Sequence, residues 1–511
     1  MKKMKKIMAL MLAAIMMMAM SVTAFAAGTT CSLTVTAKGG QDLKGQTINL
    51  YKLFDVTEST SGETKNYAYT VNTAEGYKTA LVDALTKAGK TTITAYSNAE
   101  EFAAAVLDLQ KTEGAVQKFA NDFTADALKK NLSATANSGK ITEENKTSYT
   151  FNNLAAGYYL VYVTGGKQIQ SSLVTVDATT NTVNLKTEAP SINKTADKET
   201  AEIGQVVTYT VKGAIPDTTG YAGYVYKIHD ELSKGLDFVN DVSGTACTGN
   251  KVAVTVAFTD GTDASAAPTE AAIAIDNSKK MSLDLSEWVR TNQTNKGKEF
   301  TVTYYAKVNQ DAEVTNNNKA SLEYGNNPSD TTTTTPSEAK TNTYPLDINK
   351  TKKGSEEKLA GAKFSLYTSA EDAKNGENAI KVSGSNGNYV VDPASTSTEF
   401  ESVKSIDGKG YNLHINGLEA KDYWLVETKA PEGFNKLTAP IKVTITKTGD
   451  AEWSVSKDGT AEDDKIIDVE NSSGSLLPST GGRGAIAFAV IAALLVFGVA
   501  VSFIRDKRKE A

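Results

Sequence analysis

The 511-residue sequence is poor in the residue types that usually staple a domain or bind a metal. Its two cysteines, Cys31 and Cys247, lie far apart, so a disulfide framework is excluded and any covalent reinforcement must use other chemistry. Its two histidines, His229 and His414, stand neither in a metal-ligand spacing nor beside a serine nucleophile motif. We therefore expect no metal, no cofactor and no enzyme that acts on external substrates.

The chain has no excess of basic charge, and most of it has no long apolar run. The sequence has 54 Lys and Arg residues against 60 Asp and Glu residues, a net charge of −6, without a basic stripe. This balance argues against nucleic acid as a partner. The long apolar runs lie near the two ends, at residues 7–20 and 485–504.

The N-terminal end has the pattern of a secretion signal. Four lysines precede the apolar run 7–20, and the small residues Ala24 and Ala26 follow it as a signal-peptidase site. Cys31 does not lie in the sequence context that a lipoprotein signal needs. We therefore expect residues 1–26 to be removed and the remaining chain to be secreted.

The C-terminal end predicts a processing site held at a membrane. The run 485–504 has 20 uncharged, mostly apolar residues, enough to span a bilayer as a helix, and the basic segment 505–509 should then stay in the cytoplasm. In front of this run lies a pentapeptide formed by Leu477, Pro478, Ser479, Thr480 and Gly481. Its proline and glycine disfavour helix and strand, so a protease-like cleft can reach it.

This order of motif, apolar span and basic tail resembles the LPxTG cell-wall sorting signal of Gram-positive surface proteins. The resemblance implies that a sortase cleaves the chain between Thr480 and Gly481 and transfers Thr480 to a new acceptor. The protein would then be anchored to the cell wall. A permanent single-span membrane protein is the alternative.

The length between the two end signals exceeds what one hydrophobic core suits and indicates three domains. Alternating apolar residues predict mainly β structure, and a pattern shared by residues 43–51 and 359–367 marks an internal repeat. We therefore expect tandem immunoglobulin-like β-sandwiches and, in the precursor, a C-terminal transmembrane helix. The expected segments after the signal are 27–188, 189–343, 344–474 and the sorting region 475–511.

Two local patterns modify this β plan. Residues 97–100 read as a helix capping box and are followed by apolar residues at helical spacing, so we expect helices inserted in the first domain. The threonine-rich run 331–336 reads as a loop or short linker at the end of the second domain.

In the third domain, strand alternation turns three reactive side chains toward the core. Each shares the face of its strand with apolar residues, and the three are Lys350, Glu427 and Asn471. Burial lowers the pKa of an amine and raises that of a carboxyl group, so a neutral amine can attack an amide carbon there. The alternative is a buried ion pair beside an asparagine, although such pairs seldom add net stability.

The segment 423–434 resembles the E-box of sortase-assembled pilins and CnaB-type domains. The resemblance implies an intramolecular isopeptide bond between Lys350 and Asn471, promoted by Glu427. The first domain departs from this pattern, because Tyr162 stands where the acid should be. We expect no such bond in the first domain.

The second domain repeats the pattern with different residues. An inward-facing lysine, acid and asparagine resemble those of pilin middle domains, and they are Lys194, Asp230 and Asn318. The resemblance implies a second isopeptide bond, promoted by the aspartate. The neighbours Asn316 and Asn317 leave the choice of asparagine open.

A lysine at the junction of the first two domains has the opposite orientation. Val183 and Leu185 face inward, which turns Lys186 outward, as an intermolecular nucleophile requires. The segment 183–190 resembles the pilin motif, whose lysine joins the C-terminal threonine of the next subunit, although the usual Tyr-Pro before the lysine is missing. A solvated strand lysine is the alternative.

Over its whole length the sequence resembles the major (backbone) subunit of sortase-assembled Gram-positive pili. The resemblance implies a structural cell-surface protein that supports adhesion, in which a sortase joins Thr480 of each copy to Lys186 of the next. The implied partners are the sortase, further copies of the chain, minor pilins, peptidoglycan and host surface ligands. A monomeric wall-anchored adhesin and a minor pilin stay open as alternatives.

Overall fold

The computed structural model describes residues 30–61, 64–177, 182–474 and 492. The expected secretion signal, the pentapeptide 477–481 and nearly all of the apolar run 485–504 lie outside the described residues, so what we expect of them stays a prediction. Among the described residues, no helix is long and apolar enough to cross a membrane.

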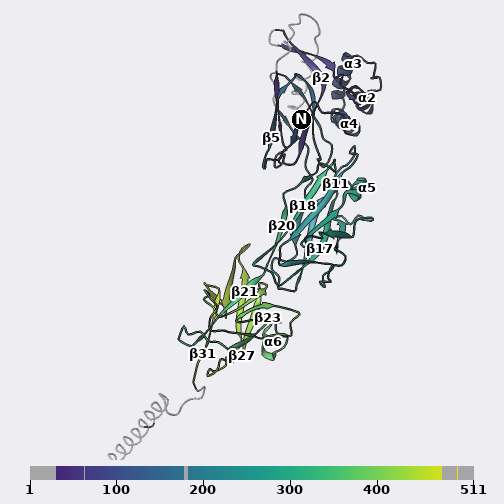
Figure 1. The fold of residues 1–511 in the computed structure, drawn as a ribbon. Helices are drawn as coiled ribbons and strands as arrows, with labels where there is room; N and C mark the ends of the chain where they lie inside the picture. Colours follow the sequence, from purple (N-terminus) through teal and green to yellow (C-terminus); the bar gives the residue numbers. More distant parts are fainter. Residues whose placement is uncertain (1–29, 62–63, 178–181, 475–491, 493–511) are drawn as a thin grey trace, which may run out of the picture.

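Figure 1 shows three bodies, built mainly of strands, that follow one another along an elongated molecule. Each body contains two sheets whose inner faces share buried apolar side chains. The prediction of tandem β-sandwiches, of which the first carries helices, is confirmed.

The first body packs a three-stranded sheet against a five-stranded sheet. Alternation along the first strand buries Leu33 and Val35 against Ile48 and Leu50 of the larger sheet. The smaller sheet, in the order β5-β1-β8, contains β1 (Cys31–Thr36), β5 (Ser148–Leu154) and β8 (Thr182–Asn184). The larger sheet, in the order β3-β2-β6-β7 with β4 paired to β2, contains β2 (Thr47–Ser61), β3 (Thr64–Val71), β4 (Ala136–Lys140), β6 (Gly157–Val163) and β7 (Ser172–Val176).

Helices pack on the other face of the larger sheet. They are α2 (Tyr77–Lys87), α3 (Ala99–Asp108), the 3₁₀ turn η1 (Leu109–Lys111) and α4 (Ala115–Lys129). Tyr51 of β2 meets Tyr77 of α2 and Phe123 of α4, with ring centroids 6.2 and 6.0 Å apart. The capping box of α3 lies one residue later than predicted, because Asn98 rather than Ser97 accepts the hydrogen bond from the backbone N–H of Glu101.

The second body contains two sheets and one short α-helix. The first sheet, in the order β12-β17-β10-β9 with β14 paired to β17, contains β9 (Asn193–Ala196), β10 (Val206–Ala214), β12 (Leu236–Val239), β14 (Thr255–Phe258) and β17 (Glu299–Val308). The second, in the order β13-β15-β16-β11-β18-β19 with β20 paired to β18, contains β11 (Val225–Leu232), β13 (Lys251–Ala253), β15 (Glu270–Ile273), β16 (Lys280–Asp284), β18 (Thr315–Gly325), β19 (Thr332–Thr333) and β20 (Ser337–Asn342). The helical segments are α5 (Ser286–Thr291) and the 3₁₀ turn η2 (Gln293–Asn295).

The third body repeats the two-sheet plan. The sheet in the order β23-β24-β26-β21-β31 contains β21 (Tyr344–Lys352), β23 (Val382–Ser385), β24 (Asn388–Val391), β26 (Leu413–Leu418) and β31 (Ile466–Asn471). The facing sheet, in the order β25-β22-β27-β28-β29-β30, contains β22 (Lys363–Tyr367), β25 (Phe400–Glu401), β27 (Asp422–Lys429), β28 (Ile441–Lys447), β29 (Trp453–Lys457) and β30 (Thr460–Glu462). One short helix, α6 (Ala370–Asn375), follows β22.

Direct contacts join neighbouring bodies. One buried residue, Thr343, separates β20 of the second body from β21 of the third. Ile203 also donates its backbone N–H to the carbonyl of Gly417 at 3.0 Å. Gly417 has a φ of 103°, and a Cβ there would lie 2.4 Å from the Ile203 side chain, so this close approach requires glycine. The second and third bodies are therefore in intimate contact.

The prediction of a loop or short linker holds for four residues of the threonine-rich run 331–336, which lie outside any strand. Part of it forms β19, which pairs with β18. The hydroxyl of Thr332 donates to the carbonyl of Gly45 in the first body at 2.6 Å. The run therefore contributes to the contact between the first two bodies, and its polar composition satisfies backbone groups there.

Candidate functional site

The first candidate site lies in the core of the third body. Strands β21 and β31 are parallel neighbours, with Lys350 opposite Val469 and Lys352 opposite Asn471. Glu427 belongs to β27 in the facing sheet. The side chains predicted to react, Lys350, Glu427 and Asn471, are all at most 2% exposed.

Hydrogen bonds hold the acid and the amide of this site together. The Nδ2 of Asn471 donates to Oε2 of Glu427 at 2.8 Å and to the carbonyl of Asn435 at 2.6 Å. The same Oε2 also accepts the backbone N–H of Leu437 at 2.8 Å. Within the described residues, the carboxamide oxygen of Asn471 has no hydrogen-bond partner. Glu427 thus fixes the amide nitrogen of Asn471, whereas no hydrogen bond from a described residue fixes its carboxamide oxygen.

The amine of Lys350 is buried without a direct ion pair among the described residues. Its Nζ donates to the carbonyls of Val469 at 2.9 Å and of Thr351 at 3.4 Å. Burial lowers the pKa of Lys350 to about 8, although the charges of Glu427 and Glu470 act in the opposite direction. With this pKa roughly a tenth of the amine is neutral at pH 7, and the neutral form is the nucleophile.

Asn412, which the sequence interpretation missed, fixes the backbone at this lysine. Its Oδ1 accepts the N–H of Lys350 at 2.6 Å, and its Nδ2 donates to the carbonyl of Lys350 at 3.2 Å. Asn412 is fully buried and precedes β26, the other neighbour of β21. Nothing in the local sequence separates this asparagine from the many asparagines of loops.

The second candidate site lies in the core of the second body. Lys194 comes from β9 of one sheet, whereas Asp230 and Asn318 come from the paired strands β11 and β18 of the other. All three residues are at most 4% exposed. The Nζ of Lys194 lies 2.7 Å from Oδ2 of Asp230.

Tyr304 of β17 is the second residue that the sequence interpretation missed. Its hydroxyl accepts hydrogen bonds from Lys194 Nζ and, at 3.3 Å, from Asn318 Nδ2, and it donates to Oδ2 of Asp230. The alternation of β17 places Tyr304 on the buried face with Phe300 and Val302, a pattern that the sequence contains. That pattern predicts burial and says nothing of contact with the reactive side chains.

Burial dominates the protonation of this second site. It lowers the pKa of Lys194 and raises the pKa of Asp230, although the two charges and the hydrogen bonds from Tyr304 and Asn318 oppose the shift of the acid. It also raises the pKa of the Tyr304 hydroxyl well above its usual range. All three pKa shifts run toward the uncharged forms of the amine, the acid and the phenol.

Asn316 and Asn318 differ in their surroundings. The Nδ2 of Asn316 donates to the carbonyl of Glu313 at 2.9 Å, and its Oδ1 accepts the N–H of Glu313 at 3.1 Å. Asn318, in contrast, contacts Tyr304, and its carboxamide oxygen has no hydrogen-bond partner among the described residues. The geometry therefore favours Asn318 as the amide that faces Lys194.

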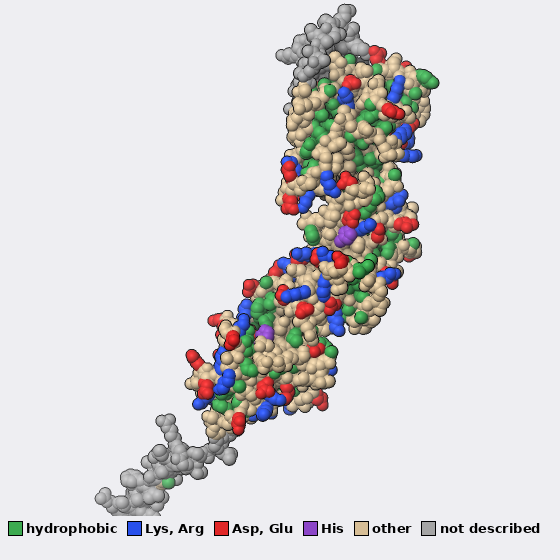
Figure 2. Space-filling view, in the orientation of Figure 1, with side chains coloured by type: hydrophobic (Ala, Val, Ile, Leu, Met, Phe, Trp, Pro, Cys, Tyr) green, Lys and Arg blue, Asp and Glu red, His purple; other side chains and the backbone are tan. Residues whose placement is uncertain are grey.

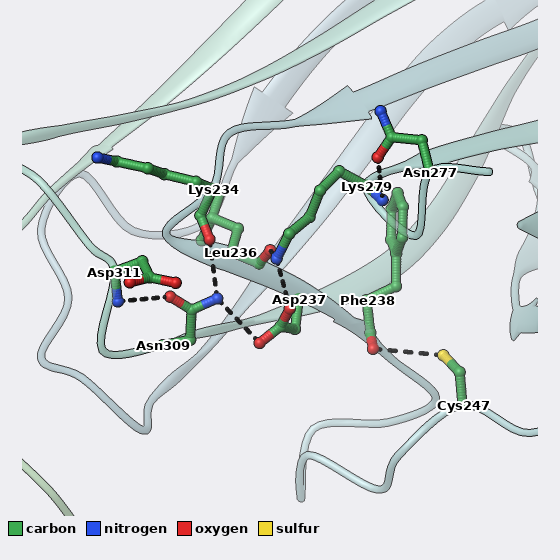
Figure 3. Close-up of polar contacts among 9 residues, drawn as sticks. All are labelled: Lys234, Leu236, Asp237, Phe238, Cys247, Asn277, Lys279, Asn309 and Asp311. Atoms are coloured by element: carbon green, nitrogen blue, oxygen red, sulfur yellow. Dashed lines mark hydrogen bonds and ion pairs between the residues drawn. The ribbon is translucent and has the colours of Figure 1, made fainter. Parts of the chain in front are cut away.

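A polar network surrounds Asp237 and Phe238 of β12 (Figure 3). Phe238 packs against Tyr304 with ring centroids 6.2 Å apart. Next to it, Asp237 accepts hydrogen bonds from Lys279 Nζ at 2.5 Å and from Asn309 Nδ2 at 2.9 Å. These contacts anchor β12, the strand that carries Phe238.

The first body has a tyrosine, Tyr162, at the position where the third body has the acid Glu427. Tyr162 is buried in β6, and its hydroxyl donates to Oδ1 of Asn326 in the second body at 3.3 Å. Lys38, just beyond β1, forms an ion pair with Glu188 near the surface. Tyr162 therefore helps to join the first two bodies.

A groove at the end of the first body contains Lys186. The cavity has a volume of about 390 Å³ and is lined by Lys38, Lys167, Gln168, Gln170, Leu185, Lys186 and Glu188. Leu185 is buried and Lys186 is exposed, as strand alternation predicted. Acidic and basic side chains are interspersed over the face seen in Figure 2, without a continuous basic stripe.

The three lysines of this groove are not equivalent. Glu188 pairs with Lys38 through Oε1 and with Lys167 through Oε2, the latter at 2.5 Å. Hydrogen bonds from these two lysines lower the pKa of Glu188 to about 2. No ion pair of Lys186 occurs with any described residue. Of the three lysine amines in the groove, that of Lys186 is therefore the one not engaged by Glu188.

Comparison with known proteins adds independent findings. Residues 345–459 match the SpaA family of prealbumin-like fold domains. The chain is 31% identical over 164 residues to a fimbrial subunit type 1 of Actinomyces viscosus, an alignment that covers 30% of this chain and 29% of that relative.

Solved structures of backbone pilins are also similar. The T6 backbone pilin of Streptococcus pyogenes is 16% identical, with a TM-score of 0.46 over 88% of this chain and 99% of that chain. The major pilin SpaA of Corynebacterium diphtheriae is 16% identical, with a TM-score of 0.45 over 87% of this chain and 100% of that chain. From the sequence matches, the chain contains a SpaA-type prealbumin-like domain and a segment homologous to a bacterial fimbrial subunit.

Proposed function

We propose that the protein is the structural backbone subunit of a covalently polymerised cell-surface pilus. In this proposal a sortase cleaves after Thr480 and joins that threonine to Lys186 of the next copy, and the completed fibre is attached to peptidoglycan. The homologous fimbrial subunit and the SpaA-type domain support a pilus role. The protein is then a substrate of an enzyme rather than an enzyme itself.

The observation that carries the proposal is the pair of buried lysine–acid–asparagine clusters in the second and third bodies. In the second body the buried Lys194–Asp230 pair would add little net stability as a mere ion pair, because desolvation of the charges offsets their attraction. In both clusters the asparagine carboxamide oxygen is buried without a partner among the described residues, an arrangement that calls for a functional explanation. Isopeptide bonds Lys194–Asn318 and Lys350–Asn471 would supply one.

The geometry of the third body suits this reaction. The neutral amine of Lys350 attacks the Asn471 carboxamide carbon, forming one C–N bond, and the original C–N bond breaks to release ammonia. Glu427, the acid that contacts the departing nitrogen, delivers one proton to it, and the proton that leaves Nζ returns Glu427 to its starting state. Burial excludes water, which would otherwise hydrate the amine and compete for the acid.

The groove around Lys186 supports the intermolecular half of the proposal. An acceptor amine must be exposed and must lie where an extended segment of another copy can approach it. Lys186 meets both conditions, and Glu188 engages the two neighbouring lysines. A head-to-tail contact that does not close on itself generates a filament.

A denaturing gel of cell-wall extracts tests the polymer. We expect a ladder of high-mass species for the unaltered chain and a single band for Lys186→Ala. Lys186→Arg should fail equally, because a guanidinium stays protonated and cannot act as the amine nucleophile. The matched control is Lys167→Ala, a change in the same groove that should leave the ladder intact.

The two alternatives give different gels. A single discrete band from the unaltered chain would identify a monomeric wall-anchored adhesin and refute polymerisation. A ladder that persists in Lys186→Ala, with this chain present once per polymer, would identify a minor pilin instead.

A further inference from the structure

The hydroxyl of Tyr304 contacts every reactive group of the second site. It accepts hydrogen bonds from Lys194 Nζ and Asn318 Nδ2, and it donates to Asp230. In the third body the corresponding amide nitrogen donates to its acid, Glu427, and to the backbone carbonyl of Asn435. The second site thus places a phenol between the two nitrogens that must exchange a proton.

We propose that Tyr304 is a catalytic residue of the second body, whose hydroxyl carries a proton from Lys194 Nζ to Asn318 Nδ2. This inference rests on the proposed Lys194–Asn318 bond and adds a group that strand patterns alone did not suggest. The competing interpretation is that Tyr304 only fills the core beside Tyr209, whose ring centroid lies 5.9 Å away.

The proposed transfer balances in atoms and charge. The neutral Lys194 amine bonds to the Asn318 carboxamide carbon and gains a positive charge, while the carbonyl π pair moves to the carboxamide oxygen as a negative charge that re-forms the carbonyl when ammonia leaves. It gives one proton to the Tyr304 oxygen while the Tyr304 hydroxyl gives its own proton to Nδ2. The Nδ2–carbon bond then breaks, ammonia leaves, and Tyr304 ends with the proton count that it had at the start. At rest the Tyr304 hydroxyl donates its hydrogen bond to Oδ2 of Asp230, so the transfer requires the O–H bond to turn from Asp230 toward Nδ2, and Asp230 accepts the hydrogen bond again afterwards.

The surroundings favour a relay by the protein over one by water. The three reactive residues are almost fully buried, and aromatic rings cover the amine: Lys194 Nζ lies 4.7 Å from the Tyr209 ring centroid and 4.6 Å from that of Tyr304. Burial also keeps the phenol protonated at rest, because it raises the pKa of Tyr304 well above its usual range. Because the Tyr304 hydroxyl accepts one proton while it donates another, it does not pass through the phenolate form.

Tyr304→Phe tests this relay, with Tyr209→Phe as the matched control. Both changes remove one buried hydroxyl from the same stacked pair, but the Tyr209 hydroxyl interacts with Thr341. The probe is the mass of the soluble chain 28–480, followed from the end of purification, with peptide mapping to locate each crosslink. Limited proteolysis compares the folding of the second body between the two variants.

We expect the unaltered chain and Tyr209→Phe to lose two ammonia molecules promptly. Tyr304→Phe should promptly lose only the one that belongs to Lys350–Asn471, and its Lys194–Asn318 bond should form about 100-fold more slowly or not at all. The bond in the third body is thus a control within the same molecule.

Two results would overturn the relay. Prompt loss of two ammonia molecules from Tyr304→Phe would leave Tyr304 a packing residue. An equal defect in Tyr209→Phe would trace the effect to the aromatic pair as a whole. Absence of the Lys194–Asn318 crosslink from the unaltered chain is a distinct outcome, since it would refute the proposed bond itself and the relay with it.

Discussion

Replacing Glu427 by glutamine should leave the third body folded but without its internal crosslink. Glutamine keeps the size of the side chain and removes the acid that holds the Asn471 amide nitrogen at 2.8 Å. The soluble chain 28–480 should then fall short of its sequence mass by one ammonia molecule, whereas the unaltered chain should fall short by two. Intact-mass spectrometry measures the difference directly.

The lost crosslink should also lower the melting temperature of the third body. A bond from Lys350 to Asn471 closes a loop of about 120 residues, and by analogy with disulfides the chain-entropy model assigns such a loop about 4–5 kcal/mol. For a domain of roughly 130 residues, each kcal/mol shifts the unfolding midpoint by about 3–5 °C. We therefore expect calorimetry to record a fall of about 12–25 °C for this domain.

Glu432→Gln is the matched control for this experiment. Glu432 is exposed in the loop after β27, so the same chemical change there should alter neither the mass deficit nor the unfolding midpoint. A full sequence mass for the unaltered chain would refute the reasoning. So would a two-ammonia deficit that survives in Glu427→Gln.

Three further outcomes are expected. Formation of the Lys350–Asn471 bond should accelerate as the pH rises toward about 8 and level off above it, because burial lowers the pKa of Lys350 to about 8 and only the neutral amine attacks. Mass spectra of chain refolded across this pH range would follow the rate. A rate that does not depend on pH would contradict the mechanism. Asn318→Ala should abolish the second-body crosslink while Asn316→Ala keeps it, because Asn316 is engaged with the backbone of Glu313; peptide mapping distinguishes the two. Glu188→Gln should remove the ion pairs of Lys38 and Lys167, so that both amines become available as acceptors. Tandem mass spectrometry of the polymer should then find Thr480 on these lysines as well as on Lys186. Linkage to Lys186 alone would show that Glu188 does not select the acceptor.

Strand alternation was sufficient to orient the candidate side chains. A strand has a period of two, so one apolar neighbour two residues away fixes the direction of a lysine or an asparagine. Lys194 and Lys350 are buried and Lys186 is exposed, as this rule predicted. The prediction of β-sandwiches succeeded for the same reason, because the alternation extends over most strands.

What the sequence could not supply depends on contacts between distant segments. Tyr304 meets Asp230 across the core from the facing sheet, and Asn412 reaches Lys350 through strand pairing. The alternation of β17 predicts that Tyr304 is buried, but no local pattern predicts the contact of either residue with the reactive residues. The shifted cap of α3 has a smaller cause, since Ser97 and Asn98 are both good capping residues and only the backbone decides between them.

The place of Lys186 just after β8 determines which parts of the molecule would bear mechanical load. In the proposed fibre, tension enters a copy at Lys186 and leaves at Thr480, so it passes through the second and third bodies alone. Lys194 lies a few residues beyond the point of entry, and the two candidate crosslinks would carry the force past the strands that they enclose. The first body would carry none of this tension, and contacts such as that of Tyr162 with Asn326 hold it to the second body. Its surface can therefore diverge without weakening the fibre.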